Sequence, residues 1–228
     1  MTYLAFFVFA LGIVVQSCRI LAGYRVSKRY AIGPRREPAF LGALYETFLA
    51  RSIMKASPVF YFFLLVFHIC FFLLILGHLE LIGEIGILQI IEHDIFLGGG
   101  VIGIALFICV LFFLFRRFHS PTREISAIDY YVLIILILAI IFGSQLHLAR
   151  RIFTYRYVNP THYQEYLSSL FSFAPELPRQ LTGTARFGGH SLLLVLHVFF
   201  ANLFLMLVPF TKIMHFILSF PLKRLQRK

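Results

Sequence analysis

The sequence is poor in charge and in cysteine, and each scarcity excludes a class of protein. Charged residues make up 14% of the 228 residues, whereas soluble domains average about a quarter, which argues against a cytosolic globule. Three cysteines are too few for a disulfide scaffold, and 60% apolar residues exclude a disordered chain. We find no internal repeat and no low-complexity tract.

The sequence is rich in long apolar segments. Five of them could cross a bilayer, which takes about 20 apolar residues per helix: residues 3–21, 58–79, 95–115, 130–148 and 191–218. The first has no basic residue before Arg19 and no small-residue cleavage site, so we expect a retained span instead of a signal peptide. The predicted fold class is all-α: a polytopic membrane protein with five transmembrane helices, forming a single domain over residues 1–228.

The net charge of +11 is distributed unevenly over the loops. Fifteen Lys and Arg residues lie in the loops at 24–57 and 116–123 and in the tail from 212, against five in the other loops. The positive-inside rule then places the N-terminus outside and the C-terminus in the cytoplasm. The charge is therefore a topology signal in a multi-pass protein of the cytoplasmic (inner) membrane, and nucleic acid is excluded as a partner.

Two connecting segments have helical patterns of their own. Apolar residues recur at helical spacing over 39–55, which predicts an interfacial helix on the cytoplasmic face. The outer loop at about 149–189 is the longest connection, and its residues 161–173 also predict a short helix. A loop of that length more often has a function than serves only as a connection.

Five histidines lie in or at the edge of spans: His68, His78, His147, His197 and His215. Ionisable groups at membrane depth are costly and indicate function by default, although an interhelical hydrogen bond is the plain alternative for any one of them. The predicted topology gives His78 and His197 one depth, near the outer face, and His68 and His215 another, nearer the inner face. The 18 residues from His197 to His215 make five whole helical turns, about 27 Å, so we expect both rings on one face, with a bend at Pro209.

This arrangement suits a haem better than zinc. Zinc takes four protein ligands, or three plus water, and no cysteine or carboxylate lies at these depths. A b-type haem needs two axial imidazoles and an apolar slot, and a bis-histidine haem has no open position, which suits electron transfer. No C-x-x-C-H motif occurs, so c-type attachment is excluded, and the isolated cysteines encode no iron–sulfur cluster. Several phenylalanines could line the slots, although aromatic packing between helices is the ordinary alternative: Phe67, Phe71, Phe72, Phe199, Phe200 and Phe204.

Three stretches resemble the gamma subunit of respiratory nitrate reductase. F-H-I-C-F-F-L-L-I-L-G-H resembles its haem-ligand helix, with histidines ten apart and glycine before the second. F-L-G-G-G-V-I-G with F-R-R-F-H-S-P-T-R is similar to its third span and cytoplasmic turn. L-H-V-F-F-A-N-L-F-L-M-L-V-P-F-T-K-I-M-H is similar to its fifth span, with histidines 18 apart. The resemblance covers residues 60–224 in order.

The resemblance implies a cytochrome b with two haems b that anchors an iron–sulfur subunit and exchanges electrons with quinone. His78 and His197 would hold the outer haem iron, and His68 and His215 the inner one. Candidates for the inner-haem propionates are Arg116, Arg117, Arg123 and Lys212, whose plain alternative is ordinary positive-inside charge.

Two departures from nitrate reductase are visible. Its gamma subunit has a lysine associated with the quinol pocket in the second outer loop, and this loop has none; Gly77, Glu92 and His93 stand near that place as quinone candidates. The outer loop before the fifth span is enlarged and rich in tyrosine. Both departures favour the gamma-like subunits of sulfate-reducer membrane complexes, which pair with cytoplasmic iron–sulfur subunits and external multihaem cytochromes c.

The leading hypothesis is an electron-transfer subunit linking menaquinone, ubiquinone or an external cytochrome c to a cytoplasmic iron–sulfur partner and other membrane subunits. Alone it would catalyse nothing, except in quinone redox. One alternative is the quinol-oxidising subunit of nitrate reductase proper. The other is a haem-free transporter or membrane anchor, although a transporter would favour several broken helices with polar groups converging at mid-membrane.

Overall fold

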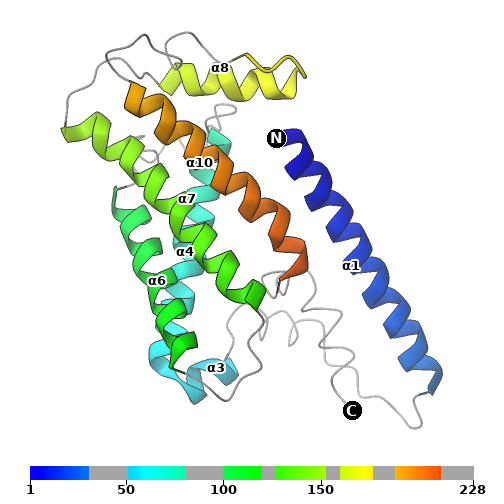
Figure 1. Cartoon of the computed structure of the whole chain (residues 1–228). Helices are drawn as coiled ribbons and strands as arrows, with labels where there is room; N and C mark the ends of the chain where they lie inside the picture. Colours follow the sequence, from blue (N-terminus) through cyan, green and yellow to red (C-terminus); the bar gives the residue numbers. More distant parts are fainter. Residues whose placement is uncertain (31–50, 81–99, 120–126, 153–159, 177–187, 212–228) are drawn as a thin grey trace. The chain divides into compact units, whose positions relative to one another are not determined.

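The computed structural model describes residues 1–30, 51–80, 100–119, 127–152, 160–176 and 188–211 (Figure 1). These residues are helical apart from short turns and ends, and five helices are long and apolar enough to cross a membrane. They are α1 (Thr2–Tyr30), α4 (Pro58–Glu80), α6 (Gly100–Phe118), α7 (Ala127–Ile152) and α10 (Gly188–Leu207). The predicted fold class, an all-α protein with five membrane-spanning helices, is confirmed. The orientation of the termini stays a prediction.

Helix starts follow from residues that suit a first turn. Pro58 opens α4, because proline lacks the N–H that would be unpaired there and has a helical φ. Asp129 lies in the first turn of α7, where a carboxylate favours the positive end of the helix dipole. As a result α7 begins three residues before the predicted span, and it continues beyond the apolar core to Ile152.

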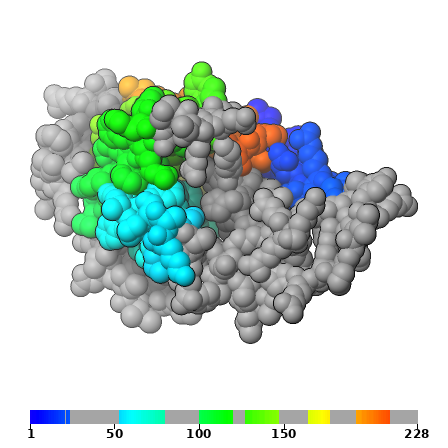
Figure 2. Space-filling model, turned by 90° about the horizontal axis from the view of Figure 1, so that it is seen from below, coloured from blue at the N-terminus to red at the C-terminus, as the bar shows by residue number. Residues whose placement is uncertain are grey.

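Two short helices accompany the spans. The helix α3 (Arg51–Ala56) lies at the end of the predicted interfacial helix, whose residues 39–50 fall outside the described part of the chain. In the space-filling view, α3 and the start of α4 lie at the surface in cyan (Figure 2). Lys55 of α3 is exposed. The helix α8 (Pro160–Phe171) occupies the long loop between α7 and α10, where a short helix was expected at 161–173.

The end of α8 has the geometry of a Schellman cap. The N–H of Ala174 donates to the carbonyl of Ser169 at 3.1 Å, and that of Phe173 to the carbonyl of Leu170 at 3.3 Å. Phe173 takes a left-handed φ of 56°, a position that glycine usually fills. The Ser169 hydroxyl also accepts from the N–H of Glu176 at 3.1 Å. The carbonyl and the hydroxyl of Ser169 therefore both stabilise the turn after α8.

The chain divides into two compact units, and α4, α7 and α10 each contribute residues to both. One unit comprises Phe63–Arg123 and Leu133–Phe200. In it, α4 packs on α6 through Phe63 and Phe112, whose ring centroids lie 4.0 Å apart, and α7 packs on α10 through Phe142 and Phe200, at 5.6 Å. Single-domain organisation over residues 1–228 stays a prediction.

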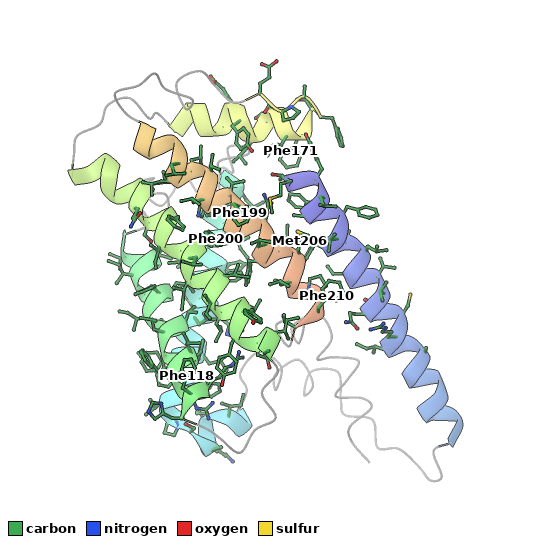
Figure 3. The ribbon with its side chains drawn as sticks, in the orientation of Figure 1. Phe118, Phe171, Phe199, Phe200, Met206 and Phe210 are labelled. Carbon is green, nitrogen blue, oxygen red and sulfur yellow. The ribbon has the colours of Figure 1, made fainter. Side chains whose placement is uncertain are left out.

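The other unit comprises Met1–Phe62, Glu124–Val132 and Ala201–Lys228. In it, α1 lies against the end of α10 and the following 3₁₀ turn η2 (Val208–Phe210), where Phe210 is labelled in Figure 3. Buried Asn202 donates its side-chain amide to the Thr2 hydroxyl at 3.2 Å. A Cβ added at Gly12 would lie 2.5 Å from the Cβ of Pro209, so the absence of a side chain at Gly12 admits the proline ring.

The interruption of the last span that was expected at Pro209 is observed. The α-helix ends at Leu207, η2 follows, and Thr211 has extended backbone with φ −115° and ψ 169°. The cause is Pro209, which has no N–H to donate and whose ring crowds the preceding turn. The Thr211 hydroxyl and N–H both donate to the carbonyl of Val208, at 2.9 and 3.2 Å. Counting whole turns from His197 therefore no longer places His215, which lies outside the described residues, and a shared face for the two rings stays a prediction.

Candidate metal centre

Two histidines from different helices meet inside one compact unit. His78 lies in the last turn of α4 and His197 in the middle of α10, and their ring centroids are 6.1 Å apart with an interplanar angle of 28°. The two residues were expected at one depth on sequence grounds. The structure thus brings their rings together across 119 residues of chain.

Each ring has one nitrogen engaged by a backbone carbonyl. Nδ1 of His78 lies 2.7 Å from the carbonyl oxygen of Leu74, and Nδ1 of His197 lies 2.9 Å from that of Ala139. A carbonyl only accepts, so Nδ1 carries a proton in both rings, and Nε2 is the nitrogen that can offer a lone pair to a metal. A hydrogen bond from the ring nitrogen that does not bind the metal fixes the tautomer and orientation of metal-binding histidines.

The spacing of the rings matches that of two imidazoles on one metal ion. Metal–nitrogen bonds of about 2 Å would bring the ring centroids of two imidazoles on one metal ion to roughly 5–6 Å from each other. The observed 6.1 Å fits this value. Two imidazoles from two apolar helices are the donor set of a b-type haem, so the residues present fit that group.

Phenylalanines of α10 flank His197 along the chain. Figure 3 labels Phe199 and Phe200 on α10; Phe200 stacks on Phe142 of α7, and Phe199 meets Phe200 edge to face at 5.2 Å. On α4, Phe67 stacks on Phe71 with centroids 5.7 Å apart and meets Phe113 of α6 edge to face. Phe67, Phe71, Phe199 and Phe200 thus take part in aromatic packing. The side chains of Phe72 and Phe199 are exposed.

His68 lies ten residues before His78 on α4 and repeats its local geometry. Its Nδ1 is 2.7 Å from the carbonyl of Leu64, four residues earlier, and the Phe67 ring meets it edge to face at 5.4 Å. Nε2 of His68 is therefore the nitrogen that carries the lone pair. Its expected partner, His215, lies outside the described residues.

The remaining predicted site residues are divided between described and undescribed segments. Arg116 and Arg117 are half-buried in the last turn of α6, and Gly77 is buried beside His78. Four lie outside the described part of the chain: Arg123, Lys212, Glu92 and His93.

Sequence reasoning missed two residues of α7 that contact His197. Ala139 provides the carbonyl, and a Cβ added at Gly143 would lie 2.8 Å from Cε1 and 2.9 Å from Nδ1 of the ring. A glycine inside an apolar span has poor helix propensity, and small residues permit close helix packing in membranes. A glycine within the apolar span at 130–148 could therefore have indicated a close contact between helices at residue 143.

No other cluster of metal-ligand type occurs in the described ranges. Among these residues, no three His, Cys, Asp or Glu side chains gather in one place. The three cysteines are free thiols, with Cys70 and Cys109 buried in α4 and α6. Within the described ranges, the pair His78–His197 is therefore the candidate metal site.

Comparison with known proteins gives one finding. The family model described as nitrate reductase gamma subunit matches residues 46–228, which covers α3 to η2 and both rings of the pair. The helix α1 precedes the matched segment. No curated protein matches the chain.

Proposed function

Because the chain belongs to the nitrate reductase gamma subunit family, a family of haem b-binding cytochrome subunits in respiratory oxidoreductases, we propose that it binds two haems b and conducts electrons across the membrane. It is a multi-pass membrane protein that transfers electrons and works with partner subunits, including an iron–sulfur subunit. The number of haems, their ligands and the route of the electrons are the content of the proposal.

The observation that carries the proposal is the pair His78–His197. Its ring separation of 6.1 Å suits two ligands on one iron, and each Nδ1 is already bonded to a carbonyl. Neither imidazole needs to change tautomer to offer Nε2 to a metal. An ordinary interhelical histidine bond would instead join the two side chains directly, at hydrogen-bonding distance between ring nitrogens.

The second haem is assigned to His68 and His215. His68 has the tautomer that a ligand requires, and His215 follows the break at Thr211, so its direction is not governed by the register of α10. We assign the propionates of this haem to three arginines and a lysine of the basic segments, because fixed cations match carboxylates. They are Arg116, Arg117, Arg123 and Lys212.

The haem, when bound, supplies one-electron redox chemistry at an iron with no open position. The chain itself holds the ligand nitrogens, orients their rings through bonds from Nδ1 to backbone carbonyls and surrounds them with apolar helices. We place the N-terminus outside and the C-terminus in the cytoplasm, in the cytoplasmic membrane, with the basic face toward the iron–sulfur partner.

At the outer face, quinone or a multihaem cytochrome c exchanges electrons with the His78–His197 haem. We assign the quinone site to Gly77, which is buried next to His78, and to Glu92 and His93, which follow in the next stretch of sequence as proton-exchanging groups. A quinone analogue should shift the redox titration of this haem. If it perturbs neither haem, the cytochrome c at the tyrosine-rich loop around α8 is the exchange partner.

Haem content of single variants tests the ligand assignment. The purified wild-type chain should give two haems b by pyridine haemochrome analysis. His78→Ala and His197→Ala should each lose the same haem, and His68→Ala and His215→Ala the other. His119→Ala is the matched control, because His119 makes the same Nδ1 bond to a carbonyl four residues earlier, at 3.0 Å, and is not an assigned ligand.

Two results would contradict the proposal. A folded wild-type chain without colour would exclude haem and leave the transporter or anchor alternative. If His78→Ala and His197→Ala affected different haems, the pairing would be wrong even though the chain is a cytochrome.

A further inference from the structure

The two ring nitrogens of the His78–His197 pair are held in different ways. His78 Nδ1 bonds a carbonyl four residues earlier on its own helix, as His68 and His119 do. His197 Nδ1 bonds Ala139, 58 positions earlier and on another helix. The His197 imidazole is thus oriented by α7 as well as by α10.

The surface of α7 accommodates this ring at a single glycine. Ala139 and Gly143 stand four residues apart, one above the other on the same helix face. A Cβ at 143 would lie 2.8 Å from Cε1, 2.9 Å from Nδ1 and 3.6 Å from Nε2. These atoms form the ring itself, and the ring is fixed at Nδ1 by the bond to Ala139, so a methyl group at 143 displaces the ring.

In a helix, the Ala139 carbonyl is also the acceptor for the N–H of Gly143. The His197 ring can donate a second hydrogen bond to the Ala139 carbonyl only if residue 143, one turn later, has no side chain that blocks the approach. Glycine is the residue without a Cβ to cover it, which explains why a poor helix former stands in the middle of an apolar span.

We infer that Gly143 is a positioning residue for the outer haem: it seats the His197 imidazole on α7 so that the Ala139 carbonyl orients and polarises it. The inference rests on the proposed function, because it takes His197 as an iron ligand. A carbonyl that accepts from Nδ1–H makes the imidazole a stronger donor at Nε2, which favours ferric iron and lowers the reduction potential.

The first test is Gly143→Ala in the full-length chain, followed by redox titration and low-temperature spectra of both haems. We expect the His78–His197 haem to shift to higher midpoint potential with a changed low-spin signal, and the other haem to stay at its wild-type values. The control is Gly103→Ala on α6, where the added Cβ would meet the Ser144 hydroxyl at 2.7 Å and no histidine. An equal shift in both variants, an unshifted Gly143→Ala, or loss of both haems in Gly143→Ala overturns the inference.

A second measurement leaves Gly143 untouched. In His197→Gly, added imidazole should restore the haem with a potential close to that of the wild type. Added 1-methylimidazole has no second N–H to donate to Ala139, so it should restore the spectrum with a higher potential. Equal potentials with the two compounds would show that the carbonyl has no influence and would overturn the inference. A wild-type chain without haem would instead refute the proposed function itself, and with it this inference.

Discussion

The contact between Gly12 and Pro209 predicts a stability difference between two chemically identical substitutions on one helix. Gly12→Ala places a Cβ 2.5 Å from the Cβ and 2.9 Å from the Cγ of Pro209, whereas Gly23→Ala meets no heavy atom within 4 Å. Both gain helix propensity of up to about 1 kcal/mol, and overpacking at Gly12 costs about 1–3 kcal/mol. Because the propensity gain is common to both, Gly12→Ala should be less stable than Gly23→Ala by about 1–3 kcal/mol.

The assay is unfolding by denaturant in mixed micelles, followed by far-UV circular dichroism because the chain has no tryptophan. A double-mutant cycle with Pro209→Gly, which removes the two atoms in the clash, should show that the cost of Gly12→Ala falls in that background. Equal stability of Gly12→Ala and Gly23→Ala, or a cost unchanged by Pro209→Gly, would refute the assignment of this contact.

Three further predictions follow from the described contacts. Gly103→Ala should destabilise the chain, because its Cβ would lie 2.7 Å from the Ser144 hydroxyl, and Gly103→Ala/Ser144→Ala should recover stability in the same assay; no recovery would point to another cause. Thr2→Ala removes the acceptor of the Asn202 amide at 3.2 Å and should cost about 0.6 kcal/mol, the average for such bonds in membranes, so a loss several times larger would mean that Thr2 does more than accept this bond. Depleting haem during expression should lower the thermal midpoint of the wild-type chain more than that of a His78→Ala/His197→Ala double variant, because a ligand stabilises only the state that binds it; equal losses would speak against a haem on this pair.

Much of the fold was predictable because hydropathy and helix-start residues are local signals. The span predicted at 58–79 is observed as Pro58–Glu80, since a proline and a continuous apolar run define its ends. The pairing of His78 with His197 by depth agrees with their neighbouring rings, although their role as ligands stays a prediction.

Other features depend on contacts between helices that sequence spacing does not contain. Gly143 is one glycine among fifteen, and its role appears only when the His197 ring lies on it. The five-turn count from His197 to His215 allowed for a bend at Pro209, whereas the helix ends at Leu207 and the backbone at Thr211 is extended. A proline predicts a disturbance, but whether the chain bends or leaves the helix depends on which groups satisfy its carbonyls.

The contact of α1 with the end of α10 has a consequence for biosynthesis. Thr2 and Asn202 stand 200 positions apart, so at about 5–20 residues per second their bond becomes available roughly 10–40 s after Thr2 is made. Until then Pro209 is not available to pack against Gly12 of α1. Lipid can cover the exposed apolar side chains of α1 in the meantime, including Phe6, Phe7 and Leu11. Joining the first and last spans is therefore a late step of assembly, which closes the unit that contains α1 and η2 after the intervening helices have been inserted.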